Sequence, residues 1–301
     1  MLNNFLSPKT KSGFTLIEIS IVLVIIGLIV GGILTGRDLI NAAAIRSQLS
    51  QLDKYNAAAK LFDTKYGGLP GDLPNPYASQ YGFIARGSLP GEGDGNGIIE
   101  GPAPGTHCVS HTTEGYGNSY GEQTTFWEDL SQVGLIEGSF TSASETDSTI
   151  QLVNQSWGTA LTATYPNARI GGGNYVTVIS GGPGWCDMSI AHNAINYFSL
   201  SVISLVNMNG TTSTPGLTVM QAQAMDSKID DGLPLSGTVT AFFSNYSLGD
   251  NSLVGAAAGT ATPGSSTTCY DNGNNSSATM AYSTRQNGGN GINCVLAFQF
   301  Q

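Results

Sequence analysis

The chain has 301 residues, of which 40 are glycine and only 11% are charged, and its formal net charge is −10 at pH 7. After residue 66 it carries 17 acidic but only 4 basic residues, which excludes the basic surface that nucleic-acid binding requires. The 40% content of hydrophobic residues is enough for a buried core, and the glycine content predicts many loops.

The first predicted element is a membrane-spanning helix over residues 14–36. This run carries a single charged residue, Glu18, and is long enough to cross a hydrocarbon core of about 30 Å. An isolated carboxylate in a spanning helix costs roughly 2.5 to 3.5 kcal/mol, so we expect Glu18 to meet a cation. Lys9 and Lys11 precede the run, as in the positively charged cytoplasmic flank of an exported segment.

Residues 11–18, Lys-Ser-Gly-Phe-Thr-Leu-Ile-Glu, resemble the prepilin leader of type IV pilins and type II secretion pseudopilins. The resemblance implies that residues 1–13 are a cytoplasmic leader, which a prepilin peptidase cuts between Gly13 and Phe14 before methylating the new amine of Phe14. It also implies that Glu18 neutralises the N-terminal amine of a neighbouring subunit during filament assembly. The alternative is a single-pass anchor in which Glu18 has no such role.

The same helix is predicted to continue to Tyr66, where Gly67 and Gly68 end it and a run of prolines follows. Apolar residues recur at helical spacings along its second half, at Ile45, Leu49, Leu52, Ala59, Phe62 and Tyr66. Residues 14–66 therefore form an N-terminal pilin helix. Its amphipathic half is expected to pack on an exported globular head, residues 67–301.

The head is predicted to be rich in β-structure, so the fold class is α+β with a pilin-like layout. Short β-branched or aromatic runs predict an antiparallel sheet packed on the helix, with strands at residues 175–179, 197–206, 238–243 and 295–300. Residues 125–136 and 221–229 predict two short helices. Residues 249–291 are rich in glycine, serine, threonine and asparagine, which predicts an exposed flexible loop.

A calcium site is a second hypothesis, carried by the glycine-rich residues 91–100. From Glu92 onward they resemble the first nine positions of an EF-hand calcium loop, with candidate ligands Glu92, Asp94, Asn96 and Glu100. The twelfth position is Ala103 instead of a bidentate glutamate, so Asp72 or Glu122 would have to complete the site through the fold. The alternative is a solvated glycine-rich turn. A second acidic group, Asp226, Asp230 and Asp231, is expected to be a solvated turn.

Four cysteines, Cys108, Cys186, Cys269 and Cys294, all follow the predicted span. An even number on the exported side predicts two disulfides formed in an oxidising periplasm. Cys269 and Cys294 resemble the C-terminal bridge of type IV pilins, which implies that they pair and leaves Cys108 with Cys186.

These observations favour a structural subunit, minor or at the tip, of a type IV pilus or type II secretion pseudopilus. Residues 69–136 and 225–237 also resemble a group of large-headed pilin-like proteins from alphaproteobacteria. The implied partners are the prepilin peptidase, an inner-membrane platform, an assembly ATPase and fellow pilins, and the implied location is the inner membrane and then a filament. The alternative is an adhesin carried on a pilin stalk. A membrane-anchored hydrolase is a remote third hypothesis, because the sequence lacks the common hydrolase and phosphate-binding motifs.

Overall fold

The computed structural model describes residues 13–87, 91–101, 121–140, 161–180, 195–207, 210–241, 258–259, 268–272, 279–285 and 287–300. The chain divides into two compact units, Met1–Ala43 and Ala44–Gln301. Helix α1 (Leu16–Tyr66) begins in the first unit and ends in the second, which confirms the predicted long N-terminal helix.

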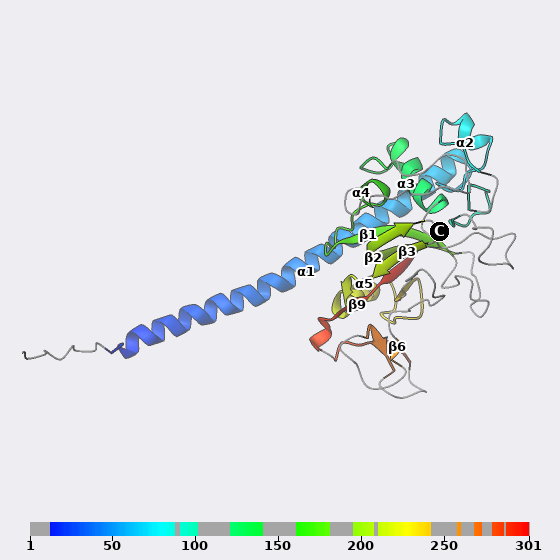
Figure 1. Cartoon of the computed structure of the whole chain (residues 1–301). Helices are drawn as coiled ribbons and strands as arrows, with labels where there is room; N and C mark the ends of the chain where they lie inside the picture. The colour runs from blue at the N-terminus through cyan, green and yellow to red at the C-terminus, as the bar shows by residue number, and fades with distance from the viewer. Residues whose placement is uncertain are drawn as a thin grey trace, which may run out of the picture. The chain divides into compact units, whose positions relative to one another are not determined.

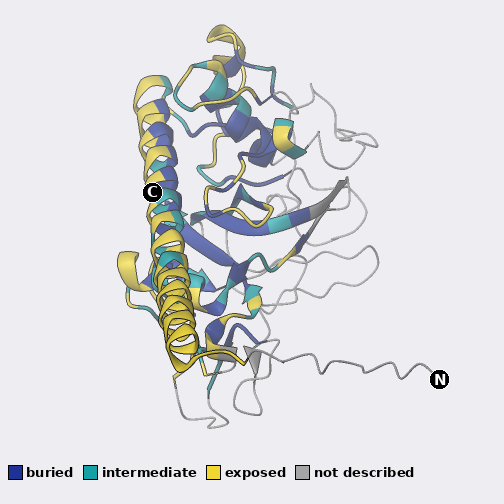
Figure 2. Ribbon diagram, turned by 90° about the vertical axis from the view of Figure 1, so that its left-hand side faces the viewer, coloured by how far each residue is buried: buried dark blue, intermediate teal, exposed yellow. Residues whose placement is uncertain are grey.

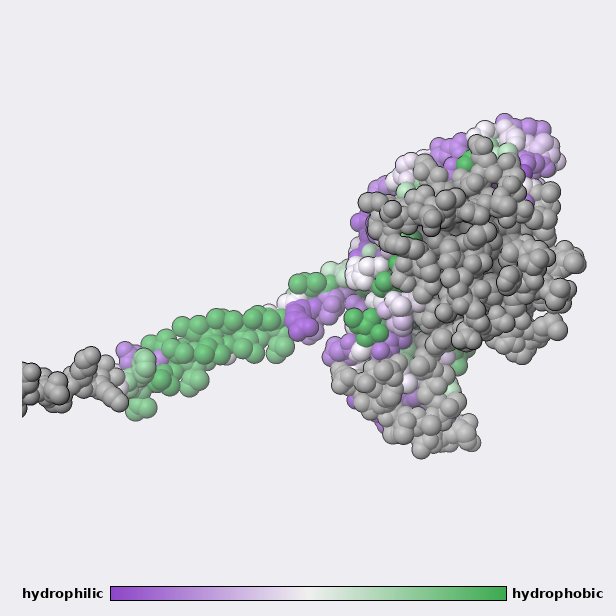
Figure 3. Space-filling view, viewed as in Figure 1, coloured by the Kyte–Doolittle hydropathy of each residue, from purple (hydrophilic) through white to green (hydrophobic). Residues whose placement is uncertain are grey.

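In the first unit, the described residues consist of a short lead-in at residues 13–15 and the beginning of α1. The apolar side chains of this part of α1 are exposed along the whole run, as the green surface in Figure 3 shows. Among the described residues, α1 is the one helix whose length and composition suit a membrane span. Such a surface needs an apolar cover, and a lipid bilayer supplies one.

In the second unit, α1 buries one face and exposes the other (Figure 2). The predicted apolar stripe is confirmed, since Ile45, Leu52, Ala59 and Phe62 are buried and Leu49 and Tyr66 are half-buried. Two glutamines share the buried face. Gln48 Oε1 accepts a hydrogen bond from the backbone N–H of Ile170 at 2.9 Å, and Gln51 Oε1 accepts one from that of Arg169 at 3.0 Å.

The main sheet has the order β1 (Asn174–Ser180), β2 (Asn196–Asn207), β10 (Leu296–Phe300) and β5 (Val239–Ala241), with all neighbours antiparallel. Strand β3 (Gly210–Thr214) also pairs with β2 (Figure 1). These strands confirm the predicted antiparallel sheet, although the structure describes only residues 238–241 of the predicted run 238–243, with the strand at residues 239–241.

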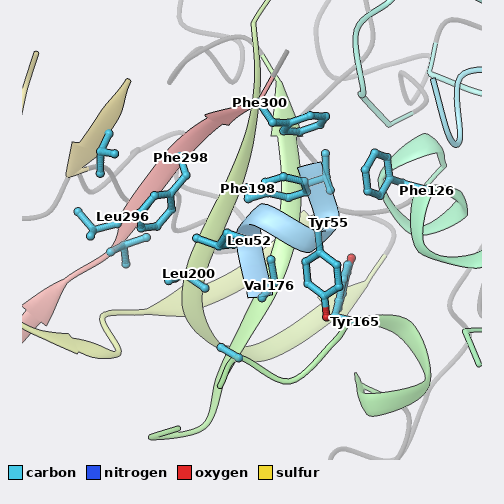
Figure 4. Packing of buried hydrophobic residues seen from close by; sticks show 14 of the residues in the cluster. Leu52, Tyr55, Phe126, Tyr165, Val176, Phe198, Leu200, Leu296, Phe298 and Phe300 are labelled. Atoms are coloured by element: carbon cyan, nitrogen blue, oxygen red, sulfur yellow. The ribbon is translucent and has the colours of Figure 1, made fainter. Parts of the chain in front are cut away.

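Aromatic rings join this sheet to α1. The rings of Phe198 and Phe300 stack with their centroids 4.2 Å apart, and the Tyr55 ring of α1 lies 6.2 Å from that of Phe198. Figure 4 shows Leu52 and Tyr55 of α1 beside Val176 and Phe198 of the sheet. The core of the second unit therefore lies between α1 and the sheet.

Two further predicted helices are confirmed, and each begins earlier than expected: α3 (Glu122–Gln132) and α5 (Val219–Ile229). The sequence did not predict the single-turn helices α2 (Tyr77–Gln80) and α4 (Leu161–Thr164), or the short pair β4 (Leu217–Thr218) and β9 (Ile292–Cys294). Such short elements carry too little periodicity to be read from sequence.

The structure describes part of residues 249–291, the segment that its composition predicts to be an exposed flexible loop. It contains β6 (Ala258–Gly259), β7 (Tyr270–Asp271), β8 (Ala281–Tyr282) and the single-turn helix η1 (Asn287–Gly289). Tyr270 and Tyr282 are buried, and Cys269 forms a disulfide with Cys294 across a Cα–Cα distance of 5.0 Å. The glycine, serine, threonine and asparagine content of this segment gave no indication that these three residues are buried. The predicted Cys108–Cys186 pair lies outside the described residues.

Candidate functional site

The start of α1 holds the residues assigned to processing and assembly. Gly13 and Phe14 lie before the helix and are exposed, and Glu18 lies in its first turn. Glu18 Oε2 accepts two hydrogen bonds from Thr15, from the backbone N–H and from the side-chain hydroxyl, each at 2.8 Å. Thr15 Oγ1 accepts one from the N–H of Glu18 at 3.3 Å. This reciprocal arrangement is a capping box, which the Thr-x-x-Glu pattern could have predicted.

The other polar side chains of residues 14–36 also bond within α1. The hydroxyl of Ser20 donates to the carbonyl oxygen of Ile17 at 2.9 Å, and that of Thr35 donates to the carbonyl oxygen of Gly31 at 3.1 Å. All four polar side chains of this run, Thr15, Glu18, Ser20 and Thr35, thus have a partner inside the same helix.

Three carboxylates from distant parts of the sequence meet in the second unit. Asp72 follows α1, Asp94 lies in the glycine-rich run and Glu122 begins α3, and each places an oxygen within 4.8 Å of the other two. Asp72 and Glu122 are each only 1% exposed, whereas Asp94 is exposed. We call these three residues the carboxylate cluster.

The glycine-rich run wraps around the two buried members of this cluster. Asp72 accepts hydrogen bonds from the N–H groups of Gly95 and Gly97, both at 2.7 Å. Glu122 accepts them from Gly93 at 2.7 Å and from Glu100 at 3.0 Å. The alternate glycines at 93, 95 and 97 have φ angles of 91°, 79° and 83°, a region that favours glycine, and this explains their spacing.

Of the four calcium ligands predicted from sequence, the structure brings Asp94 into the carboxylate cluster. Asn96 lies beside it, and its side-chain nitrogen donates to Asp94 Oδ2 and to Glu100 Oε1, both at 3.1 Å. Glu92 and Glu100 are buried outside the cluster. Asp72 and Glu122 supply the other two carboxylates. The sequence named them only as residues that could complete the site if the fold placed them beside the glycine-rich run.

Burial dominates the electrostatics of this cluster. Burial raises the pKa of Asp72 to about 7, although the N–H groups of Gly97 and Gly95 lower it, and the nearby charge of Asp94 raises it further. Burial also raises the pKa of Glu122 well above its ordinary value, with the charge of Asp72 as the next cause. A divalent cation among these oxygens would offset both the burial and the mutual repulsion.

A buried ion pair positions Asp72 against α3. Arg86 and Asp129 are 2.6 Å apart, with side chains 2% and 1% exposed, and Asp129 also accepts a hydrogen bond from the N–H of Gly71 at 2.7 Å. At Gly71, a Cβ atom would lie 2.4 Å from the carbonyl oxygen of Glu122, so only glycine allows this approach. The pair thus helps to hold the residue before Asp72 against the first turn of α3.

The second acidic group, Asp226, Asp230 and Asp231, also places its oxygens within 4.8 Å of one another. Its carboxylates accept hydrogen bonds from the turn that follows α5, including one from the N–H of Gly232 to Asp226 at 3.1 Å. This agrees with the expected turn. However, Asp226 is buried instead of solvated, because Tyr282 covers it and donates a hydrogen bond to it at 2.8 Å.

A family model described as the prokaryotic N-terminal methylation motif matches residues 8–34. No curated protein and no solved structure matches the chain. The matched range includes Gly13, Phe14 and Glu18 and covers the apolar run of α1 up to residue 34. It ends within α1 and does not include the second unit.

Proposed function

We propose that this chain, which carries the N-terminal signal of type IV pilins and pseudopilins, is a structural subunit of a type IV pilus or of a type II secretion pseudopilus. One observation carries the proposal: the matched motif coincides with the start of a long helix whose exposed apolar run holds a single acid in its first turn. The apolar helix also supports anchoring in the inner membrane before assembly.

Processing would take place at Gly13 and Phe14. A prepilin peptidase would cut the peptide bond between them and methylate the amine of Phe14. The position of both residues before the first turn of α1 supports this, because a protease needs substrate backbone that is free of helical hydrogen bonds.

Assembly would pair Glu18 with the N-terminal amine of a neighbouring subunit. A buried carboxylate and a buried ammonium are each costly, and only a correctly staggered neighbour relieves both costs. The pair would therefore set the register between subunits. The assembly platform and its ATPase would be further partners.

The size of the head supports a minor or tip position. The chain that follows α1, residues 67–301, is several times longer than α1 itself, and a bulky head would crowd a helical lattice. Quantitative mass spectrometry of sheared filaments tests this position. We expect this chain to be a small fraction of the filament protein, and a filament made mostly of this chain would contradict the proposal.

The processing proposal is tested by the N-terminal sequence and the mass of the protein from bacterial membranes, with and without an active prepilin peptidase. With the peptidase we expect the chain to start at Phe14 with a methylated amine, and without it we expect the leader to remain. A chain that starts at unmodified Met1 in the presence of the peptidase would contradict the pilin assignment.

We also propose that the carboxylate cluster binds a calcium ion. The support is the convergence of Asp72, Asp94 and Glu122 and the burial of two of them, because Ca²⁺ takes six to eight oxygen ligands and favours carboxylates. Its role would be to hold the glycine-rich run against α3 and the end of α1. A metal-dependent gain in stability, described in the Discussion, is the test.

A further inference from the structure

A cavity of about 520 Å³ lies between the end of α1, the single-turn helix α2 and the glycine-rich run. Its volume is in the range of small-molecule sites, which is about 300 to 1,000 Å³. Three tyrosines line it: Tyr66 ends α1, Tyr77 begins α2 and Tyr81 directly follows α2. Neither the proposed role in a filament nor the proposed calcium site gives these tyrosines a function.

The three tyrosines are only partly covered by the rest of the head. Tyr77 and Tyr81 are 55% and 52% exposed, and Tyr66 is half-buried. The rings of Tyr66 and Tyr81 meet edge to face, with their centroids 5.1 Å apart and their planes at 69°, so they form a corner instead of a flat stack. The face of an aromatic ring attracts a cation. The chain itself gives an example, because Nζ of Lys65 lies 4.8 Å from the centroid of the Tyr66 ring.

The charges of the cavity also favour a cation. Asp63 lies on α1 one turn before Tyr66 and is exposed. Asp72 is almost fully buried, and its oxygens accept hydrogen bonds from the N–H groups of Gly95 and Gly97, which line the cavity as well. Among the described residues that line the cavity, none is basic. An anionic ligand would therefore be repelled, and a neutral ligand would gain nothing from these charges.

We propose that this cavity binds a primary ammonium group, of the kind that an exposed lysine side chain of a partner protein presents. The ammonium carries three N–H donors, and the exposed carboxylate of Asp63 can accept from them, whereas a quaternary ammonium has no donor to offer. The carbon stem of the lysine would pack on the tyrosine rings. The inference goes beyond the proposed function, since it assigns a ligand to the head and requires neither filament assembly nor calcium.

The first test is an NMR titration of the full chain in detergent and calcium-free buffer, with Nα-acetyl-lysine amide as the probe. Nα-acetyl-norleucine amide keeps the carbon stem but lacks the ammonium, and choline offers a quaternary ammonium. We expect the lysine probe to shift the ring signals of Tyr77 and Tyr81 and to bind about fivefold more tightly than either comparison ligand. Unchanged ring signals, or equal or tighter binding of norleucine amide or choline, would overturn the inference.

The second test places the binding in the cavity. We expect Asp63→Asn and Tyr81→Leu each to weaken binding of the lysine probe by about three- to fivefold. Asp53→Asn is the matched control, because Asp53 is an exposed acid on the same helix that is not among the residues lining the cavity, and it should bind the probe like wild type. Equal weakening by Asp53→Asn and Asp63→Asn would show that binding follows net charge alone, and unchanged binding in both Asp63→Asn and Tyr81→Leu would show that the probe binds elsewhere. Either result would overturn the inference.

Discussion

Arg86 and Asp129 show how much one pair of side chains contributes to the head. Both are almost fully buried, and Arg86 also donates to the carbonyl oxygens of Leu73 at 3.3 Å and Ile84 at 2.9 Å. Burial raises the pKa of Asp129, and the Arg86 charge acts against that rise. If one partner is removed, the other is left as a buried charge without compensation.

We therefore expect Arg86→Met to lower the free energy of unfolding by about 3 to 5 kcal/mol. Arg169→Met is the matched control. Arg169 pairs with Glu137 at 3.7 Å, but the side chains are 54% and 92% exposed, and an exposed pair contributes only about 0 to 1 kcal/mol. Denaturant unfolding measures both variants. Similar losses for the two would show that the buried pair has no special role.

Glu18 gives the second prediction at the scale of residues. We expect Glu18→Ala to leave cleavage after Gly13 intact but to lower filament incorporation by more than about tenfold, because the neighbour's amine would be buried without its carboxylate. Ser20→Ala, which removes another polar side chain of the same helix, should be incorporated normally. Loss of incorporation in both variants would point to a damaged helix instead of a missing ion pair.

At the scale of elements, the helices and strands that the sequence predicted correctly are those with a clear local sequence pattern. The stripe from Ile45 to Phe62 and the β-branched or aromatic runs of β1, β2 and β10 come from residues close in sequence, and local patterns reveal them. The carboxylate cluster is different. Its members stand at positions 72, 94 and 122, and no local pattern encodes that they meet. The spacing of oxygen-bearing residues in the glycine-rich run therefore indicated Asp94, but only the folded structure shows that Asp72 and Glu122 lie beside it.

The disulfide between Cys269 and Cys294 connects the segment before β7 to the end of β9, across 25 residues of sequence. We expect the double variant Cys269→Ser/Cys294→Ser to lose about 3 kcal/mol of stability, since a closed loop of this size restricts the unfolded chain. Thermal or denaturant unfolding of the oxidised proteins measures the loss. An unchanged midpoint would mean that the surrounding packing alone holds β7 in place.

At the scale of the whole molecule, we expect calcium ions and protons to compete for the carboxylate cluster, and the stability of the fold to depend on both. The folded-state pKa of Asp72, about 7, lies above the value of about 3.9 expected in the unfolded chain, so the protonated carboxyl stabilises the fold at low pH. This contribution is complete below the unfolded pKa and is lost as pH rises through about 7. Burial also raises the pKa of Glu122, which faces the same site, so its carboxyl acts in the same direction.

We therefore expect the calcium-free protein to lose stability between about pH 4 and pH 7, and Ca²⁺ to restore it most strongly at the upper end. At a concentration about 100 times its Kd, the gain would be about 2.7 kcal/mol. Calorimetry of the full chain in detergent, with CaCl₂ or with a chelator, measures it.

Asp94→Asn is the decisive variant, because it removes an exposed charge of the cluster but keeps the Oδ1 atom that accepts from the N–H of Asn96 at 3.1 Å. It should abolish the gain from Ca²⁺. Asp53→Asn, an exposed acid on α1 far from the glycine-rich run in sequence, should keep the gain. An equal response of both variants and wild type would contradict calcium binding at the cluster.

The position of β10 has a consequence for the stage of synthesis at which the main sheet can form. This strand follows every other strand in the sequence, yet it lies between β2 and β5 in the sheet and contributes the stacked Phe300. The sheet therefore cannot close until residues 296–300 are available to pair with β2 and β5. A translation product that stops short of residue 296 would leave β2 and β5 each with an unpaired edge, and unpaired strand edges are sites of aggregation.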